Sequence, residues 1–266
     1  MTLACSTYAL YAESRAAKQP LPLGASKTGG RPHLPAGLAH PADRNGLLSV
    51  FHAQINLAEI AHLQTWLPRC GMLYCFVNDT EYAETPNVVY ADCAQGALAA
   101  CEYSDTTRWS DSDLDAETLP TEHALQFSGG VSVPNFYNIV DHAAARHAKW
   151  RHLLDHDAMD DKIHRRVDKF SDLMVDFPDR LAERRLMPPP QRSHSMNVHV
   201  FTQHESPQEH SAAKFGGYAH EWMNLLCLES IGDLNFWDAG TLTYSIHKQD
   251  LAVADFGRVV ASIKSS

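Results

Sequence analysis

The sequence predicts an α+β fold: two similar β-rich halves, related by internal duplication, with a helical block inserted between them. The first observation is that one order of segments occurs twice, a Lys-x-Gly-Gly turn followed by two apolar runs. The two copies are 27–30 with 54–56 and 71–77, and 214–217 with 224–230 and 240–246. The second observation is a long segment between the copies whose apolar residues recur near helical spacing. Glycine turns followed by short β-branched or aromatic runs are typical of strands, so a duplicated β unit is the simplest explanation.

The first half, 1–140, is predicted to begin with a helix at 3–19, where apolar residues are mixed with alanine and with charges of both signs. The prolines and glycines of 21–41 exclude a long helix and predict an ordered, extended loop. The elements that follow are predicted to be a strand at 47–56, a short helix at 57–67, and strands at 72–78, 88–92 and 97–103.

The helical block, 141–190, is predicted from apolar residues that recur near a helical period up to position 185. Three consecutive prolines, at 188–190, end it, because proline removes a backbone donor and restricts the residue before it. They are the predicted linker into the second half, 191–266. That half is predicted to start near Met196 with a strand of alternating polar and apolar residues.

The charge balance limits the possible partners. The chain has 266 residues, with 22 basic and 32 acidic side chains, which gives a formal net charge of −10. Phosphate backbones require a basic surface, so we expect no nucleic-acid partner. An acidic protein attracts a basic macromolecule, and a basic protein is therefore the expected partner.

The sequence also bears on the compartment. The first twenty residues lack a basic start followed by an unbroken apolar run, so no secretory signal is expected. No window reaches the roughly 20 apolar residues that span a bilayer. The six cysteines include no Cys-x-x-Cys pair and lie mostly in apolar runs. We therefore expect a soluble, cytoplasmic protein with reduced cysteines and no membrane partner.

Several blocks resemble the YwqG-like family, a set of largely uncharacterised bacterial proteins. They share an order of motifs with it: Ser-Lys-Thr-Gly-Gly-Arg-Pro from Ser26, Ala-Gln-Ile-Asn-Leu-Ala-Glu-Ile from Ala53, Lys-Phe-Gly-Gly from Lys214, and Asp-Ala-Gly-Thr-Leu from Asp238. The resemblance implies an α+β fold with duplicated β-rich halves, and it carries over no catalytic residue. Some relatives are immunity proteins of bacterial toxin systems, so it also implies a product that binds and neutralises a toxin.

The chain has 16 histidines, which raises the question of a metal site. His152 and His156 are four apart and would share a helix face, with Asp155 or Asp160 as an oxygen ligand. The segment lacks the glutamate of a His-Glu-x-x-His hydrolase helix. We expect no metal, no cofactor and no catalytic residue. A metal-dependent enzyme that uses this helix, and a housekeeping protein that binds a small molecule, remain as alternatives.

The leading hypothesis is a non-catalytic immunity protein that binds a cognate, basic bacterial toxin. From 105 to 122 the chain carries six acidic residues and the single Arg108, which predicts a solvated loop or a short capped helix. A second acidic stretch lies in the helical block. The predicted partner-binding residues are Asp111, Asp113, Asp115, Glu117, Asp155, Asp157, Asp160 and Asp161.

Overall fold

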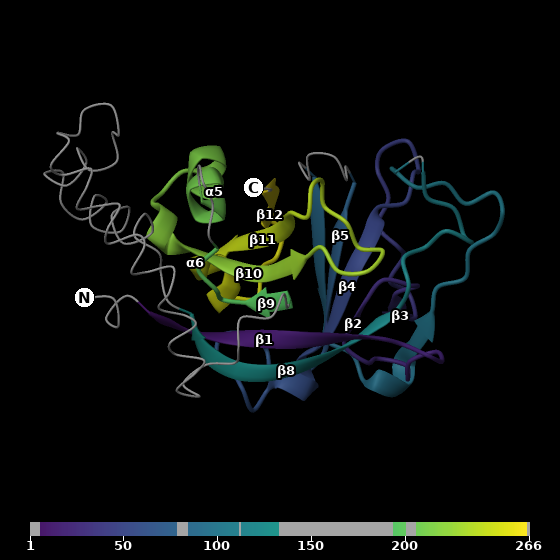
Figure 1. The fold of residues 1–266 in the computed structure, drawn as a ribbon, viewed down its shortest axis with the longest axis horizontal. Helices are drawn as coiled ribbons and strands as arrows, with labels where there is room; N and C mark the ends of the chain where they lie inside the picture. Colours follow the sequence, from purple (N-terminus) through teal and green to yellow (C-terminus); the bar gives the residue numbers. More distant parts are fainter. Residues whose placement is uncertain (1–5, 79–84, 112, 133–193, 201–205, 265–266) are drawn as a thin grey trace, which may run out of the picture.

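The structure is a computed structural model of the chain (Figure 1). It describes residues 6–78, 85–111, 113–132, 194–200 and 206–264. Every statement of structure below refers to these residues.

The main element of the described chain is one ten-stranded sheet in which neighbouring strands are antiparallel. In spatial order its strands are β12 (Val260–Lys264), β11 (Thr241–His247), β10 (Trp222–Glu229), β9 (His194–Met196), β1 (Thr7–Ala16), β8 (His123–Ser132), β2 (Lys27–Thr28), β4 (Val50–Asn56), β5 (Met72–Val77) and β6 (Pro86–Ala91). A separate two-stranded sheet pairs β3 (His33–Pro35) with β7 (Leu98–Ala100).

The described helices are short. They are α2 (Leu57–Ile60), α5 (Pro207–Phe215) and α6 (Lys248–Ala252), with 3-10 turns η1 (Gln95–Ala97) and η4 (Ala219–Glu221). The longest of them, α5, has nine residues and begins at a capping box formed by Ser206 and Glu209. No helix in the described ranges is long and apolar enough to cross a membrane.

The large sheet curls so that its two ends face each other (Figure 1). Tyr90 on β6 lies against Phe256, which precedes β12, with ring centroids 6.0 Å apart. His52 on β4 shares a hydrogen bond with the Tyr244 hydroxyl on β11, at 3.1 Å. The main core fills the space enclosed by this curl, because alternate residues of each strand point inward. A second core lies on the outer face of β4 and β5, where β3 and β7 cover Tyr74.

The first half agrees with the predicted strands but not with the predicted N-terminal helix. Strands β4, β5, β6 and β7 lie within or overlap the segments expected to be extended, and α2 occupies the start of the predicted helix 57–67. The helix predicted at 3–19 is wrong, because residues 7–16 form β1. Leu10 points into the main core and Ala9 to the opposite face, which is the alternation of a strand.

The described residues are mostly β and show no repeated unit. Strands from both ends of the chain pair in one sheet, in which β1 lies between β8 and β9. The two Lys-x-Gly-Gly segments differ in setting, since Lys27 is a buried residue of β2 and Lys214 is an exposed residue of α5. The expected duplication is therefore not seen. The predicted helical block, 141–190, lies outside the described residues, and the division at 140 and 190 stays a prediction.

Candidate functional site

The residues predicted to bind a partner in the first half lie in a loop between β7 and β8, as the sequence indicated. We call residues 111 and 113–118 the acidic loop. The Asp111 carboxylate accepts a hydrogen bond from the Asp113 backbone N–H at 3.0 Å. The Asp115 carboxylate accepts from the backbone N–H groups of Glu117 and Thr118, both at 2.8 Å. These hydrogen bonds lower the pKa of Asp115, so it stays ionised and fixes the loop backbone.

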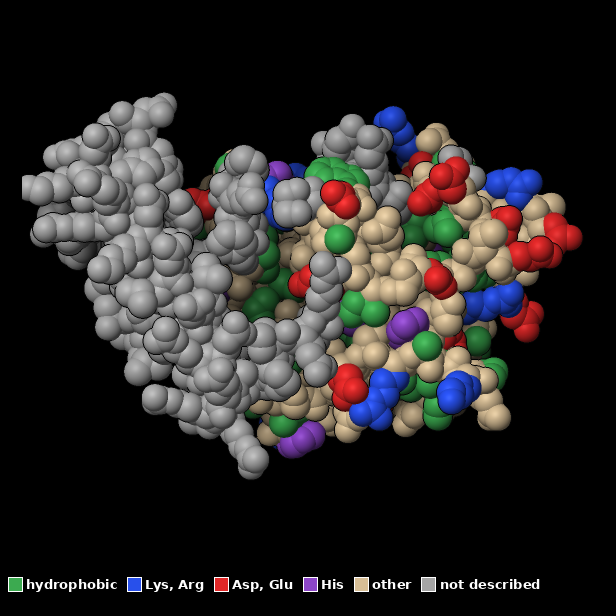
Figure 2. Space-filling model, in the orientation of Figure 1, with side chains coloured by type: hydrophobic (Ala, Val, Ile, Leu, Met, Phe, Trp, Pro, Cys, Tyr) green, Lys and Arg blue, Asp and Glu red, His purple; other side chains and the backbone are tan. Residues whose placement is uncertain are grey.

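Two of the four predicted carboxylates in this loop remain available to a partner. The side chains of Asp113 and Glu117 are exposed, and neither carboxylate makes a hydrogen bond or ion pair with the described part of the chain. Acidic side chains gather at the right-hand end of the face in Figure 2, over the loops drawn in teal in Figure 1. The acidic loop thus separates two roles: Asp111 and Asp115 shape it, and Asp113 and Glu117 supply its free charge.

The start of the acidic loop is attached to the chain segment before β4. The backbone N–H of Leu48 donates to the Arg108 carbonyl at 2.9 Å, and the backbone N–H of Ser110 donates to the Leu48 carbonyl at 2.8 Å. Between these bonds Trp109 is buried and lies edge-on to the Tyr103 ring, at 5.0 Å between centroids. A buried aromatic side chain contributes a large apolar area, so this end of the loop is held firmly.

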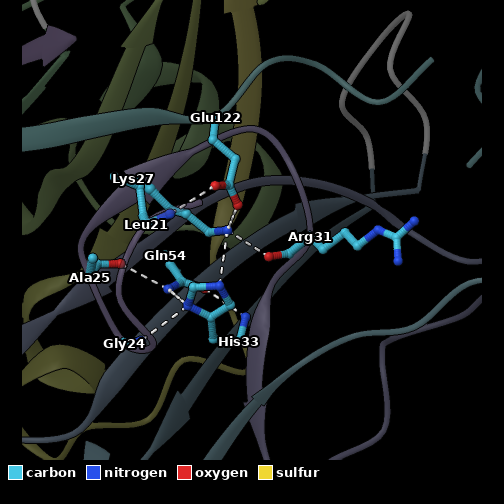
Figure 3. Close-up of polar contacts among 8 residues, drawn as sticks. All are labelled: Leu21, Gly24, Ala25, Lys27, Arg31, His33, Gln54 and Glu122. Atoms are coloured by element: carbon cyan, nitrogen blue, oxygen red, sulfur yellow. Dashed lines mark hydrogen bonds and ion pairs between the residues drawn. The ribbon is translucent and has the colours of Figure 1, made fainter. Parts of the chain in front are cut away.

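The other end of the loop is attached through Glu122, just before β8. Its carboxylate forms an ion pair with Lys27 on β2 (Figure 3). The Lys27 side chain is completely buried, and the Glu122 side chain is 23% exposed. Lys27 also donates to the Arg31 carbonyl at 2.7 Å. A buried cation requires such partners, because an unpaired one would be strongly destabilising.

Two glycines allow the strand end and the loop end to approach each other. Gly29 and Gly30 have φ angles of +67° and +65°, a conformation that favours glycine. A Cβ on Gly29 would lie 2.3 Å from the Thr121 carbonyl oxygen, and one on Gly30 would lie 2.3 Å from Cγ of Glu122. Gly29 and Gly30 form a bend directly after β2, and their lack of side chains leaves room for Glu122 beside Lys27.

His33 on β3 completes the buried polar cluster around Lys27 (Figure 3). Its Nδ1 accepts from the Gly24 backbone N–H at 3.1 Å. Gln54 contacts both the backbone and the ring of His33. Its Oε1 accepts from the His33 backbone N–H at 2.8 Å, and its Nε2 lies 3.1 Å from the ring nitrogen Nδ1. The other ring nitrogen, Nε2, lies 3.3 Å from Lys27 Nζ, which can only donate. Burial, and secondly the Lys27 charge, lower the pKa of His33 to about 4.

The cluster joins segments that are far apart in the sequence. Gln54 also donates to the Ala25 carbonyl at 2.8 Å, and the Tyr74 hydroxyl donates to the His33 carbonyl at 2.5 Å. These contacts hold β2, β3, β4 and the end of the acidic loop together. We call Lys27, His33, Gln54 and Glu122 the clamp, because their contacts fix the position of a surface loop.

A scan against protein-family models decides the family. Residues 26–264 match DUF1963, a domain of unknown function. The chain belongs to the DUF1963 family. A search of curated proteins found no match.

The DUF1963 match spans both the clamp and the acidic loop, since it begins one residue before Lys27. Sequence reasoning missed the clamp. A lysine beside two glycines, and a glutamine within an apolar strand at Gln54, were the available signals, but nothing local to them points to Glu122, which is 95 residues away from Lys27.

The remaining predicted residues lie outside the described part of the DUF1963 chain. They are Asp155, Asp157, Asp160 and Asp161, together with the two histidines of the alternative metal site, His152 and His156. Among the described residues no group of three or more histidine, cysteine or acidic side chains is placed to hold a metal ion. His194, one of the second-half histidines, is fully buried on β9 and accepts from the Glu229 backbone N–H at 3.1 Å.

Proposed function

We propose that this DUF1963 protein is a cytoplasmic, non-catalytic immunity protein that neutralises a cognate bacterial toxin by binding it directly. The observation that carries the proposal is the acidic loop, which is anchored at both ends and presents the Asp113 and Glu117 carboxylates to solvent. We also infer that the chain is a member of the YwqG-like proteins within its family, from the order of its sequence motifs.

Preorganisation supports a binding function for this loop. A flexible loop must lose conformational freedom when it binds, and that loss reduces affinity. Here Asp111 and Asp115 fix the turns, while Trp109 and Glu122 fix the ends. A partner would therefore meet two carboxylates that are already in place.

Charge supports a basic partner. The formal net charge of −10 would accelerate encounter with a cationic protein, and the two exposed carboxylates would pair with its lysines or arginines. A toxin that acts on nucleic acid or on membranes carries such a basic surface. Covering that surface would inhibit it without any chemical step.

Co-expression with the toxin encoded by the neighbouring reading frame tests the proposal. We expect the wild-type chain to restore growth and the double variant Asp113→Lys/Glu117→Lys to fail. The control is the single variant Asp238→Lys, which reverses an exposed carboxylate on another loop and should still protect. If the wild-type chain neither binds the toxin nor restores growth, the proposal is wrong.

A further inference from the structure

A surface pocket lies away from the acidic loop, beside the segment that follows α2. It is a pocket of about 510 Å³ between the start of β1, residues 61–69 and Asn197. This volume is within the range of small-molecule sites. Its lining contains one arginine, Arg69, and one histidine, His62, and no aspartate or glutamate. In a chain with 32 acidic residues, a pocket free of carboxylates is suited to an anion.

The aromatic wall of the pocket is formed by Tyr8 and Trp66. Their ring centroids are 6.2 Å apart in an edge-to-face arrangement, and Tyr8 is 47% exposed. Tyr8 lies directly over Gly129 on β8: a Cβ there would be 1.9 Å from the Tyr8 hydroxyl oxygen. Only glycine leaves room for the ring in this position.

Asn197 fixes the backbone under Tyr8. It has a φ angle of +56°, which asparagine tolerates better than most residues. Its side-chain amide donates to the Tyr8 carbonyl at 2.9 Å and to the Thr7 hydroxyl at 3.0 Å. The Asn197 amide therefore fixes the backbone that carries Tyr8.

Two residues that line the pocket, Arg69 and Trp66, each carry a polar group without a partner among the described residues. The exposed Arg69 guanidinium makes no hydrogen bond or ion pair with the described residues. The indole Nε1 of Trp66 is buried and, within the same part of the chain, has no hydrogen-bond partner. An unsatisfied buried donor destabilises a protein unless an acceptor reaches it. The indole N–H is closed to solvent, so the charged group that a ligand in the pocket would meet is the Arg69 guanidinium, for which an anionic ligand would provide a counter-charge.

We propose that this pocket binds a small aromatic carboxylate. The ring of the ligand would pack against Tyr8 and Trp66, and its carboxylate would bind Arg69, whose planar fork matches a carboxylate. The site is independent of the acidic loop, so it would give the protein a small-molecule ligand in addition to a protein partner.

Titration with 2-naphthoate, followed through the Trp66 indole N–H resonance in ¹H–¹⁵N spectra, tests the proposal. Trp66→Phe assigns that resonance and preserves an aromatic ring. We expect a saturable shift with a Kd on the order of 1 mM or below, as expected for a ligand of this size. The uncharged analogue 2-naphthamide should bind about tenfold more weakly, because it lacks the charge-assisted contact.

Variants separate the proposed contacts from general effects. Arg69→Gln should weaken 2-naphthoate about tenfold, and the matched control Arg44→Gln, an exposed arginine outside the pocket, should not. Gly129→Ala should displace Tyr8 and also weaken binding. The unchanged positions of the other indole resonances check that each variant is folded. No shift of the Trp66 resonance at about ten times the expected Kd, or equal binding of the two probes, would overturn the proposal.

Discussion

Lys27 and Glu122 form an ion pair that links the middle of the large sheet to the end of the acidic loop. The two residues are 95 positions apart in the sequence, and the Lys27 side chain has no solvent exposure. The surface that we propose to bind a toxin is therefore followed in the chain by a buried charge pair that attaches it to the sheet. This relationship can be tested through stability, through the adjoining glycines and through binding.

Removal of the Glu122 charge should destabilise the fold. Glu122→Gln leaves the buried Lys27 ammonium without its counter-charge, and the expected loss in free energy of unfolding is about 3 kcal/mol. Urea unfolding measures it. Lys27→Met/Glu122→Leu should recover much of this loss, because it removes both charges. A loss below about 1 kcal/mol for Glu122→Gln would show that the pair is not a structural clamp.

Gly29 offers a test of the close approach between β2 and the loop end. Gly29→Ala should destabilise by about 1–2 kcal/mol for the positive φ and by about 1–3 kcal/mol more for the clash with Thr121. Gly37→Ala is the matched control, since Gly37 has a φ of +88° and open space around its Cβ direction. Equal losses of thermal stability in the two variants would contradict the steric argument.

Stability should fall as the pH is lowered from about 6.5 toward 4. Burial lowers the pKa of His33, His52 and His194 from the ordinary value of 6.5 to about 4. In this window the unfolded chain binds protons that the folded chain does not, so each histidine can cost on the order of 1–2 kcal/mol between pH 7 and pH 5.

Urea unfolding at the two pH values measures this dependence. His52→Asn should reduce it, because asparagine can still bond to the Tyr244 hydroxyl but does not titrate. The same pH dependence in the variant and the wild type would exclude His52 as a contributor.

The two roles in the acidic loop can be separated with equal changes of charge. Asp113→Ala removes only a free carboxylate, whereas Asp115→Ala also removes the acceptor for the Glu117 and Thr118 backbone N–H groups. We expect Asp115→Ala to weaken toxin binding more, because the loop must then be ordered on binding. Calorimetric titration of both variants with the toxin would show this, and an equal loss would mean that the loop acts through charge alone.

The fold could be predicted from the sequence where the local pattern was strong. Glycine turns next to apolar runs located β4, β5, β10 and β11. The alanine-rich start of the chain was read as helical, but β8 and β9 on either side of β1 impose the extended conformation. The common sheet could not be predicted, because pairing between distant strands leaves no local pattern.

The candidate site was predictable in its charges but not in its support. A run of acidic residues with one arginine indicated a solvated loop, and the described residues 111 and 113–118 agree. The distinction between Asp113 and Asp115 depends on which carboxylate meets backbone N–H groups, which only the folded loop defines. The pocket beside Tyr8 was likewise hidden, because β1, residues 61–69 and Asn197 are brought together by the curl of the sheet.

The association rate with the cognate toxin tests the central claim most directly. Stopped-flow measurements at low and high salt would compare the wild type, Asp113→Lys/Glu117→Lys and the control Asp238→Lys. We predict that the double variant associates at least about tenfold more slowly at low salt, that the difference shrinks at high salt, and that the control changes little. Equal rates for the double variant and the wild type at low salt would contradict the assignment of the acidic loop as the toxin-binding surface.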